Sequence, residues 1–362
     1  MIVGTLQRYF AWRFLGTVLA VFVGIYALIS LIDYVELTKR TAQAPNVSAW
    51  MVLKASFFRV PLHTERIMPF AVLVGTMSCY LNLSRRLELV IARSAGMSAW
   101  QFISPALTMA LILGVLATTV YNPLSAVMQE RSKRIEAEIY GEQPAGSAGG
   151  SSFWARQRSG EGQSIINAQT SREQGVVLDG VTVFAFDAAG HFQHRIEAKG
   201  AVLEAGNWRL TEARLYGAGV PLREHSTYLL STNLTPEQVR ESFATPETVP
   251  FWQIPMYIEM AEHAGLVAAG YRLQYQKLLA RPFLLAAMVL LAAAVSLRFF
   301  RFGGVQKMIL SGVSAGFLLY VLSKVTEDLS KAQLMHPVAA AWLPVLVGGL
   351  TGFVALLYQE DG

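Results

Sequence analysis

Six long apolar stretches constrain this chain most, because each is long enough to cross the hydrocarbon core of a bilayer as a helix. They lie at residues 14–32, 67–83, 100–121, 283–300, 307–323 and 338–357. A bilayer core is about 30 Å thick and a helix rises about 1.5 Å per residue, so roughly 20 apolar residues span it. Only 15% of the residues are charged, whereas soluble proteins have roughly 25%. The sequence therefore predicts an integral membrane protein with two groups of three spans.

The first stretch has some features of a secretory signal. Arg8 and Arg13 precede it, and the small residues Ala42-Gln43-Ala44 follow it. Its apolar run, however, covers 19 residues, whereas the core of a signal peptide has about 7–15. The small residues also lie well beyond the end of the run. We therefore expect a retained membrane span.

Cysteine content and net charge exclude several classes of site. The single cysteine, Cys79, lies within an apolar stretch, which excludes an intramolecular disulfide and a metal site built from several cysteines. The net charge is only +5, and in a membrane protein basic residues favour contact with anionic lipid over binding of nucleic acid. We therefore expect no nucleic-acid partner.

The two groups of spans are separated by a polar insert at residues 122–282, which is long enough to form a domain. Short alternating runs, such as VTVFAFD, FQHRIEAKGAVLE and WRLTEARLYG, are separated by turns that contain glycine, which is typical of an antiparallel β-sandwich or roll. GEQPAGSAGGSS leads into the strands, and the proline-rich TPETVPFWQIP leads out.

The expected fold is a membrane α-helical protein, with six transmembrane helices in a 3+3 arrangement and an inserted all-β, jellyroll-like domain. Residues 1–121 hold the first three spans, residues 122–255 the β domain, and residues 256–362 a connecting helix and the last three spans.

The distribution of basic residues predicts the orientation in the membrane. If the N-terminus is inside, the short inner segments carry Arg8, Arg13, Arg85, Arg86, Arg93, Arg298, Arg301 and Lys307. The short outer loops carry fewer, namely Lys39, Arg40, Lys324 and Lys331. Because basic residues concentrate on the cytoplasmic side, both termini are expected to be cytoplasmic. The large β domain then lies outside the cytoplasm.

The segment between the second and third spans, residues 85–101, is a short amphipathic connector. Leu87, Val90, Ile91 and Ser94 recur at helical spacing, so one face is largely apolar. Gly96 suits the end of a helix, and S-x-x-Q at residues 98–101 is a capping box that opens the next helix. The connector either rests on the lipid surface or docks a cytoplasmic partner.

Motifs of nucleotide-binding and catalytic sites are missing. The sequence contains no phosphate-binding P-loop, no H-E-x-x-H and no G-x-S-x-G. His191 and His194 lie near a turn in a strand-like region, where two surface histidines are expected and not a metal site. We therefore expect no catalytic residue, no metal and no cofactor. We expect a membrane protein of this kind to be a subunit that takes its energy from a partner.

Five segments of the sequence resemble segments of a known protein family. The first three are ELVIARSAGMSAWQF, AGYRLQYQKLLARPF and SGVSAGFLLYVLSKV. They are similar to the cytoplasmic coupling helix, the helix entering the fourth span and the fifth span of the lipopolysaccharide-export permeases of the LptF/LptG family. NWRLTEARLY and TNLTPEQV resemble segments of its outer domain, more closely in the LptG branch. The 3+3 layout around an outer domain matches as well, so the resemblance covers nearly the whole chain.

The resemblance implies a non-catalytic subunit of an ABC transporter in the inner membrane. Such a subunit forms a heterodimer with an LptF-like permease and binds a dimer of the ATPase LptB, which holds the ATP. The complex extracts lipopolysaccharide and passes it to periplasmic jellyroll proteins of the LptC and LptA kind. Glu88 stands where the family has a coupling-helix glutamate, although Leu87 replaces the serine that commonly precedes it. The expected coupling residues are Arg85, Arg86, Glu88, Leu89, Arg93 and Gly96.

Extraction of an anionic lipid requires cationic side chains at the outer surface of the membrane. The candidates are Lys39, Arg40, Lys54, Arg59, Arg66, Arg131, Lys133, Arg134 and Lys324. Ordinary snorkelling of basic side chains is the alternative explanation for them. Lys324 is also placed to pair with Glu327 or Asp328 on the next helical turn. Asp33 stands where some relatives carry a basic residue, so no cationic contact is expected there.

The acyl chains of the lipid need an apolar shelter outside the membrane, because each CH₂ exposed to water costs about 0.8 kcal/mol. The candidate lining residues of the β domain are Phe184, Phe186, Ile196, Val202, Leu203 and Leu210. Plain core packing is the alternative for each. In the fifth span, Gly312 and Gly316 form a small-xxx-small face, which is either a fixed dimer seam or a moving one.

Three other functions stay open from the sequence. The first is the paralogous LptF subunit. The second is a lipoprotein-release permease, which typically has four spans with its domain after the first. The third is a membrane-bound enzyme that modifies envelope glycolipids, for which Arg59, His63, Glu65 and Arg66 are the candidate cluster.

Overall fold

The chain forms two compact units in a computed structural model. The structure describes residues 2–41, 48–140, 153–159, 162–172, 175–187, 191–204, 206–217, 220–232, 246–263, 268–302 and 304–360. A helical unit comprises Met1–Ile139, Pro250–Trp252 and Arg272–Gly362, and a β unit comprises Tyr140–Val249 and Gln253–Tyr271. The expected leading segment 141–152 and most of TNLTPEQV lie outside the described residues.

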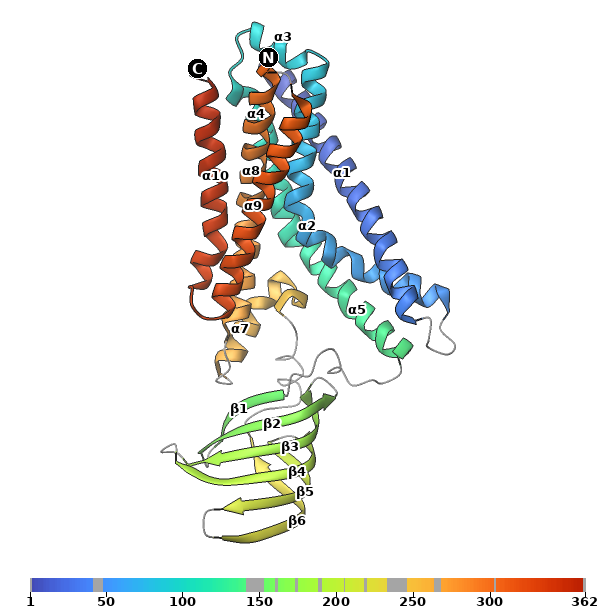
Figure 1. Cartoon of the computed structure of the whole chain (residues 1–362), viewed down its shortest axis with the longest axis vertical. Helices are drawn as coiled ribbons and strands as arrows, with labels where there is room; N and C mark the ends of the chain where they lie inside the picture. Colours follow the sequence, from blue (N-terminus) through green and yellow to red (C-terminus); the bar gives the residue numbers. More distant parts are fainter. Residues whose placement is uncertain are drawn as a thin grey trace. The chain divides into compact units, whose positions relative to one another are not determined.

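Long helices account for nearly all of the helical unit (Figure 1). They are α1 (Ile2–Thr41), α2 (Ala49–Arg85), α3 (Glu88–Ser94), α4 (Ala99–Leu116), α5 (Asn122–Tyr140), α8 (Ala269–Phe302), α9 (Val305–Lys331) and α10 (Pro337–Glu360), with a π-helix η1 (Ala117–Tyr121) between α4 and α5. Three short helices lie where the chain returns from the strands. Of these, η3 (Pro246–Thr248) and α7 (Ile254–His263) belong to the β unit, and Phe251 and Trp252 of the 3₁₀ helix η4 (Phe251–Gln253) belong to the helical unit. Six of the described helical segments are long and apolar enough to cross a membrane, which confirms the six predicted spans.

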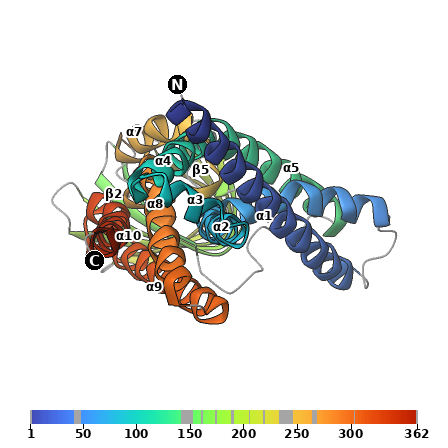
Figure 2. The same ribbon diagram turned by 90° about the horizontal axis from the view of Figure 1, so that it is seen from above.

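Several helices extend well beyond the apolar stretches from which they are predicted. The third span continues without a break through η1 and α5 to Tyr140, although α5 is largely polar. In α5, Ile135 and Ile139 pack with Leu37 of α1 and Val52 of α2, and this small apolar cluster stabilises the extension. Figure 2 shows α1 and α5 running out on the side away from α10. Hydropathy detects only the part of a helix that lies in lipid, which explains why the predicted third span ends at residue 121.

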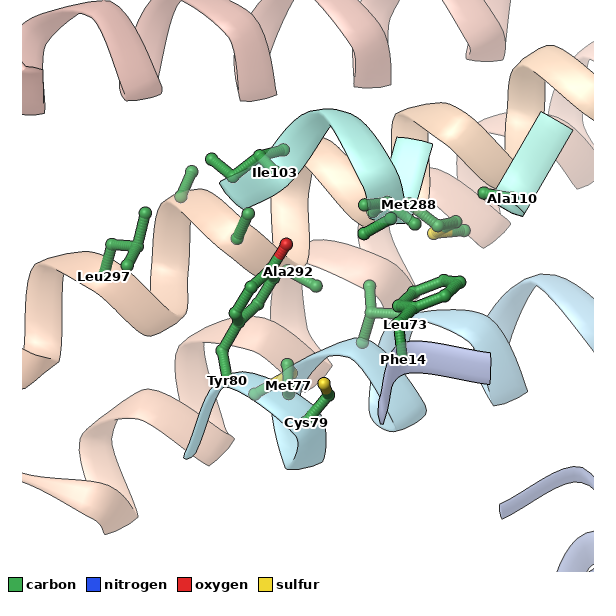
Figure 3. Close-up of a cluster of buried hydrophobic side chains, with 14 of the residues drawn as sticks. Phe14, Leu73, Met77, Cys79, Tyr80, Ile103, Ala110, Met288, Ala292 and Leu297 are labelled. Atoms are coloured by element: carbon green, nitrogen blue, oxygen red, sulfur yellow. The ribbon is translucent and has the colours of Figure 1, made fainter. Parts of the chain in front are cut away.

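One apolar core joins the two groups of spans (Figure 3). It combines Phe14 of α1, Leu73 of α2, Ile103 of α4 and Met288 of α8. A Cβ atom built on Gly114 would clash with the Pro282 Cα atom, so α4 and α8 approach as closely as a glycine permits.

The small-residue face of α9 is used inside the chain. A Cβ atom on Gly312 would clash with the Met77 side chain, and one on Gly316 would lie 2.9 Å from the Leu73 side chain. Both contacts are with α2, so this face is a seam between α9 and α2 of the same chain. The interpretation as a dimer seam is therefore wrong.

The β unit contains one antiparallel sheet whose strands pair in chain order (Figure 1). They are β1 (Phe153–Ser159), β2 (Gly162–Arg172), β3 (Val177–Phe186), β4 (Phe192–Glu204), β5 (Asn207–Gly217) and β6 (Val220–Ser231). This confirms a membrane helical protein with an inserted β domain. The described strands form a meander, whereas a jelly roll is built from two Greek keys.

Gln157 shows that the sheet is rolled, because this β1 side chain reaches the far end of the sheet. Its buried amide Nε2 donates to the Ser164 hydroxyl of β2 at 2.9 Å. Its Oε1 accepts from the Trp208 Nε1 of β5 at 3.2 Å and from the Thr232 hydroxyl, just after β6, at 2.7 Å. The first strand thus contacts the end of the last strand across the inside of the roll.

Candidate functional site

The connector between the second and third spans forms the short helix α3, and local signals define its ends. Leu87, the residue before it, has a left-handed backbone with φ of 63°. Gly96 follows α3 with φ of +83°, which confirms the helix stop expected from glycine. The Ser98 amide donates to the Gln101 Oε1 at 3.2 Å, as a capping box requires. Figure 1 shows α3 at the end of the helical unit where both chain termini lie.

The two faces of α3 differ in their surroundings. Leu89 and Ala92 are buried in the core that joins the spans. Leu87, Val90 and Ile91 lie on the other side and are 59%, 40% and 65% exposed. Exposed apolar side chains that gather on one surface commonly mark an interaction site. The inward face therefore anchors α3 to the membrane helices, and the outward face presents apolar side chains at the surface.

Glu88 at the start of α3 is held by α1. The Tyr9 hydroxyl donates to the Glu88 Oε2 at 2.9 Å. Arg13 Nε donates to the same hydroxyl at 2.9 Å, and its Nη2 lies 3.9 Å from the Glu88 Oε1. The expected coupling glutamate is thus tied to the first span. Tyr9 is not among the expected site residues, because it lies 79 positions away in sequence.

The other expected coupling residues divide between surface and core. Arg85 and Arg86 are exposed between α2 and α3. The Arg93 guanidinium lies 5.9 Å from the centroid of the Phe102 ring in α4. Leu89 is only 2% exposed, so it anchors the helix and does not lie on the outward surface.

Eight of the nine expected lipid-binding residues lie on α1, α2 and α5. The contacts of four of these eight within the chain are as follows. Arg59 lies between the Asp33 Oδ1 at 3.5 Å and the Glu136 Oε1 at 3.7 Å. Arg40 pairs with Glu36 and Arg134 with Glu130, each one helical turn away. The Lys54 ammonium lies 5.6 Å from the Trp50 ring centroid. Lys39, Arg66, Arg131 and Lys133 are exposed.

Lys324, the ninth candidate, belongs to a separate cluster around Glu327 of α9. The Lys324 ammonium lies 3.5 Å from Glu327 and 3.5 Å from Asp328, as the helical spacing predicts. Lys331 donates to the Glu327 Oε1 at 2.6 Å, and Lys277 of α8 donates to its Oε2 at 2.8 Å. Lys277 is not among the expected residues, because its partner is 50 positions away in sequence.

Two charged residues of the candidate enzyme cluster, Arg59 and Glu65, have different partners. Arg59 engages carboxylates on α1 and α5. Glu65 is 4% exposed and binds Arg281 of α8 and Asn122 of α5. The two charged groups therefore serve different helix contacts, and the structure does not favour a shared catalytic centre.

The expected lining residues of the β unit lie on two faces. Ile196, Leu203 and Leu210 belong to the buried apolar cluster inside the roll. Phe184, Phe186 and Val202 do not, and their buried neighbours Val183, Ala185, Ala201 and Leu203 occupy the inner face instead. The expectation for these three residues is wrong. Successive side chains alternate between faces, and β3 is apolar on both, so its pattern cannot distinguish them.

Comparisons with protein families and with individual proteins give matches to the same kind of protein, a lipopolysaccharide export permease. Residues 8–358 match the family model described as "Lipopolysaccharide export system permease LptF/LptG". The chain is similar to the lipopolysaccharide export system permease protein LptG of Escherichia coli strain K12, with 22% identity over 353 residues and 94% of each chain covered. It is also similar to LptG of Haemophilus influenzae, with 23% identity over 359 residues, 95% of this chain and 96% of the relative. The family match includes residues of both units.

Proposed function

Because the chain belongs to the lipopolysaccharide export permease family LptF/LptG, we propose that it is a transmembrane permease subunit of an ABC transporter that extracts lipopolysaccharide from the inner membrane. It forms a heterodimer with a second, LptF-like permease and binds a dimeric, LptB-like ATPase. The lipid then passes to LptC- and LptA-like proteins of the periplasm. The curated relatives named above are both LptG, which supports the LptG branch over the paralogous LptF.

The outward face of α3 is the observation that carries the proposal. Leu87, Val90 and Ile91 form an exposed apolar surface next to the charged Arg86 and Glu88. Full burial of one such side chain contributes about 1.5–3 kcal/mol. Since these three are 40–65% exposed, covering them contributes part of that amount for each to the binding of a partner. The ATPase is the partner that a permease without a nucleotide motif requires.

Movement of the ATPase reaches the spans through two contacts. Leu89 and Ala92 embed α3 in the core formed with α2, α4 and α8. Glu88 connects α3 with α1 through Tyr9 and Arg13. A shift of α3 is therefore transmitted to both groups of spans, and the change in their packing releases the lipid from the membrane.

The orientation of the protein in the membrane is inferred from the end of the helical unit that contains α3. The start of α1, the end of α10 and the helix α3 lie at the same end of the helical unit (Figure 1), and Arg8, Arg13, Arg85 and Arg86 belong to this end. The concentration of basic residues supports a cytoplasmic location of this end. The β unit follows α5 in the chain, beyond the opposite end of the third span, and is then periplasmic.

Exposed cations bind the anionic head group of the lipid, and the apolar interior of the roll holds its acyl chains. Lys39, Arg131 and Lys133 are exposed near the end of α1 and on α5, where they are accessible to phosphates and acidic sugars. Ile196, Leu203 and Leu210 line the interior of the roll, which suits acyl chains. Transfer into such an interior spares the lipid about 0.8 kcal/mol for each CH₂ removed from water.

Purification of the chain from native membranes tests this function. Mass spectrometry of the purified complex is expected to identify a second permease, an ATPase and bound lipopolysaccharide. An Ile91→Asp variant is expected to lose the ATPase and keep the second permease. Leu334→Asp is the matched control, because Leu334 is exposed in the turn between α9 and α10. A complex without an ATPase, or an Ile91→Asp complex that keeps it, would refute the proposal.

A further inference from the structure

Glu65 lies between two prolines within α2. The helix contains Pro61 and Pro69, four residues before and four residues after Glu65. A proline has no backbone N–H and therefore removes one hydrogen bond of the helix at each site, which bends helices. Figure 1 shows α2 as a bent helix. Glu65 is 4% exposed, so its carboxylate lies inside the packed helices at this bend.

The Glu65 carboxylate binds side chains from two other helices. Its Oε1 accepts from Asn122 Nδ2 of α5 at 2.8 Å and from Arg281 Nη1 of α8 at 2.5 Å. Its Oε2 accepts from the Ser125 hydroxyl of α5 at 2.5 Å. Since α2 and α5 belong to the first group of spans and α8 to the second, one carboxylate joins both groups.

Asn122 extends this network to the segment where the chain returns from the β unit. Its side-chain Oδ1 accepts from the backbone N–H of Phe251 at 2.9 Å. The Phe251 ring stacks on Tyr275 of α8, with centroids 5.5 Å apart and an interplanar angle of 10°. Trp252 Nε1 donates to the Thr119 carbonyl at 3.1 Å. The η4 segment is therefore fixed to the third and fourth spans through the same group of residues.

The π-helix η1 lies directly before Asn122 and makes contacts of its own. The Thr118 hydroxyl donates to the Leu278 carbonyl of α8 at 2.9 Å, and the Tyr121 hydroxyl donates to the Pro61 carbonyl of α2 at 3.1 Å. Short π-helical turns inside α-helices are frequent at functional sites. Here the irregular turn lies beside the bend of α2.

A buried ion pair is weak evidence for stability, because desolvation of two charges offsets their attraction. An ionisable side chain inside a membrane protein more often marks a functional element. Glu65 lies at the bend of α2 and connects both groups of spans, and through Asn122 it is also linked to the η4 segment. The part of α2 that follows Glu65 packs in the same apolar core as α3.

We propose that Glu65 is a positioning residue for lipid export: through Arg281, Asn122 and Ser125 it fixes the bend of α2, so that movement of α3 reaches the second group of spans and the η4 segment together. This inference rests on the proposed function. Among the described residues, the Glu65 carboxylate makes its hydrogen bonds with α5 and α8 and not with the exposed surface of α3. Its removal is therefore expected to uncouple ATP hydrolysis from lipid transfer and to leave both partners bound.

The test uses the complete complex of both permeases and the ATPase in proteoliposomes that contain lipopolysaccharide. The quantity to measure is the amount of lipid transferred to a periplasmic acceptor for each ATP hydrolysed, in wild type and in Glu65→Gln. Coupling between sites typically corresponds to factors of about 5–150, and we expect the ratio to fall roughly tenfold with the ATPase still bound. Glu65→Asp, which keeps the carboxylate, is expected to restore most of the ratio.

Glu327→Gln is the matched control, because Glu327 is also a shielded, ion-paired carboxylate, but its ion pairs within the described part of the chain are with lysines of α8 and α9. Its ratio is expected to stay within about twofold of wild type. An unchanged ratio in assembled Glu65→Gln, or an equal loss in Glu327→Gln, would overturn the inference. If Glu65→Gln does not assemble, Ser125→Ala removes one hydrogen bond and leaves the ion pair, and an unchanged ratio in that variant would overturn it as well. If the wild type itself transfers no lipid, the proposed function fails instead.

Discussion

Tyr9 and Glu88 lie 79 positions apart in sequence, and the Tyr9 hydroxyl donates a hydrogen bond of 2.9 Å to the Glu88 carboxylate. This contact fixes the start of α3 to the first span. Arg13 donates to the same hydroxyl and lies 3.9 Å from Glu88, so the three side chains form one group. The short helix α3 is therefore tied to α1 as well as to the apolar core of the helical unit.

Reversal of the charge at Glu88 is expected to uncouple the transporter. Glu88→Lys places a cation beside Arg13 and removes the acceptor of the Tyr9 hydroxyl. We expect the lipid-dependent stimulation of the ATPase to be lost while the protein still folds. Measurement of ATP hydrolysis with and without lipopolysaccharide checks this. Glu36→Lys is the control, because Glu36 pairs only with the exposed Arg40 in the described contacts of α1. Normal transport in Glu88→Lys would contradict the account.

The seam between α9 and α2 predicts a stability effect at one glycine. Gly316→Val drives a branched side chain against Leu73, which a Cβ atom alone would approach to 2.9 Å. Overpacking of this kind costs about 1–3 kcal/mol, so the melting temperature in detergent should fall. Gly24→Val in α1 is the matched control, since a Cβ atom added at Gly24 would have no neighbour within 4 Å among the described residues. Equal melting temperatures of the two variants would show that α9 does not pack on α2 in this way.

The buried amide in the β unit predicts a second stability effect. Gln157→Leu leaves the Trp208 Nε1 and the Thr232 hydroxyl without their acceptor inside the roll. Each unsatisfied buried group costs about 1–3 kcal/mol. We expect the β unit to become sensitive to proteolysis at a lower temperature than in wild type. Thr227→Leu, on an exposed position of β6, should leave the sensitivity unchanged. A Gln157→Leu variant as resistant as wild type would show that the roll does not depend on this contact.

Arg59 is expected to act mainly in stability, unlike the exposed cations near it. Its guanidinium lies between Asp33 and Glu136, and removal of one partner of a buried ion pair costs about 3–5 kcal/mol. Because the Arg59 side chain is 23% exposed, the loss in Arg59→Ala should be smaller than this. Thermal melting measures it, with Arg134→Ala as the control, since an exposed pair within one helix contributes about 0.3–0.5 kcal/mol. A stable Arg59→Ala variant with weakened lipid binding would instead assign this residue to the lipid.

Local signals in the sequence predict the features that depend on nearby residues. The six spans, the helix stop at Gly96 and the capping box of Ser98 and Gln101 all follow from residues within one segment. The alternation of the strands likewise predicts an antiparallel β domain.

Features that depend on distant residues escape prediction from the sequence. Glu65 and Arg281 are 216 positions apart, and no spacing rule connects them. The extension of α5 depends on contacts with α1 and α2, which hydropathy does not detect. The pattern of β3 favours Phe184 and Phe186 for the inner face, but the smaller Val183 and Ala185 beside them give an equally apolar alternate face.

The most direct test of the account asks on which side of the membrane α3 lies. A cysteine introduced at the exposed Ile91 provides the probe, and the native Cys79 is buried and only 3% exposed. Whole cells are treated with a thiol reagent that does not cross the inner membrane, before and after permeabilisation. The account predicts that Ile91→Cys is labelled only after permeabilisation and is protected when the ATPase is bound. Labelling in intact cells would place α3 in the periplasm and contradict the proposed coupling to a cytoplasmic ATPase.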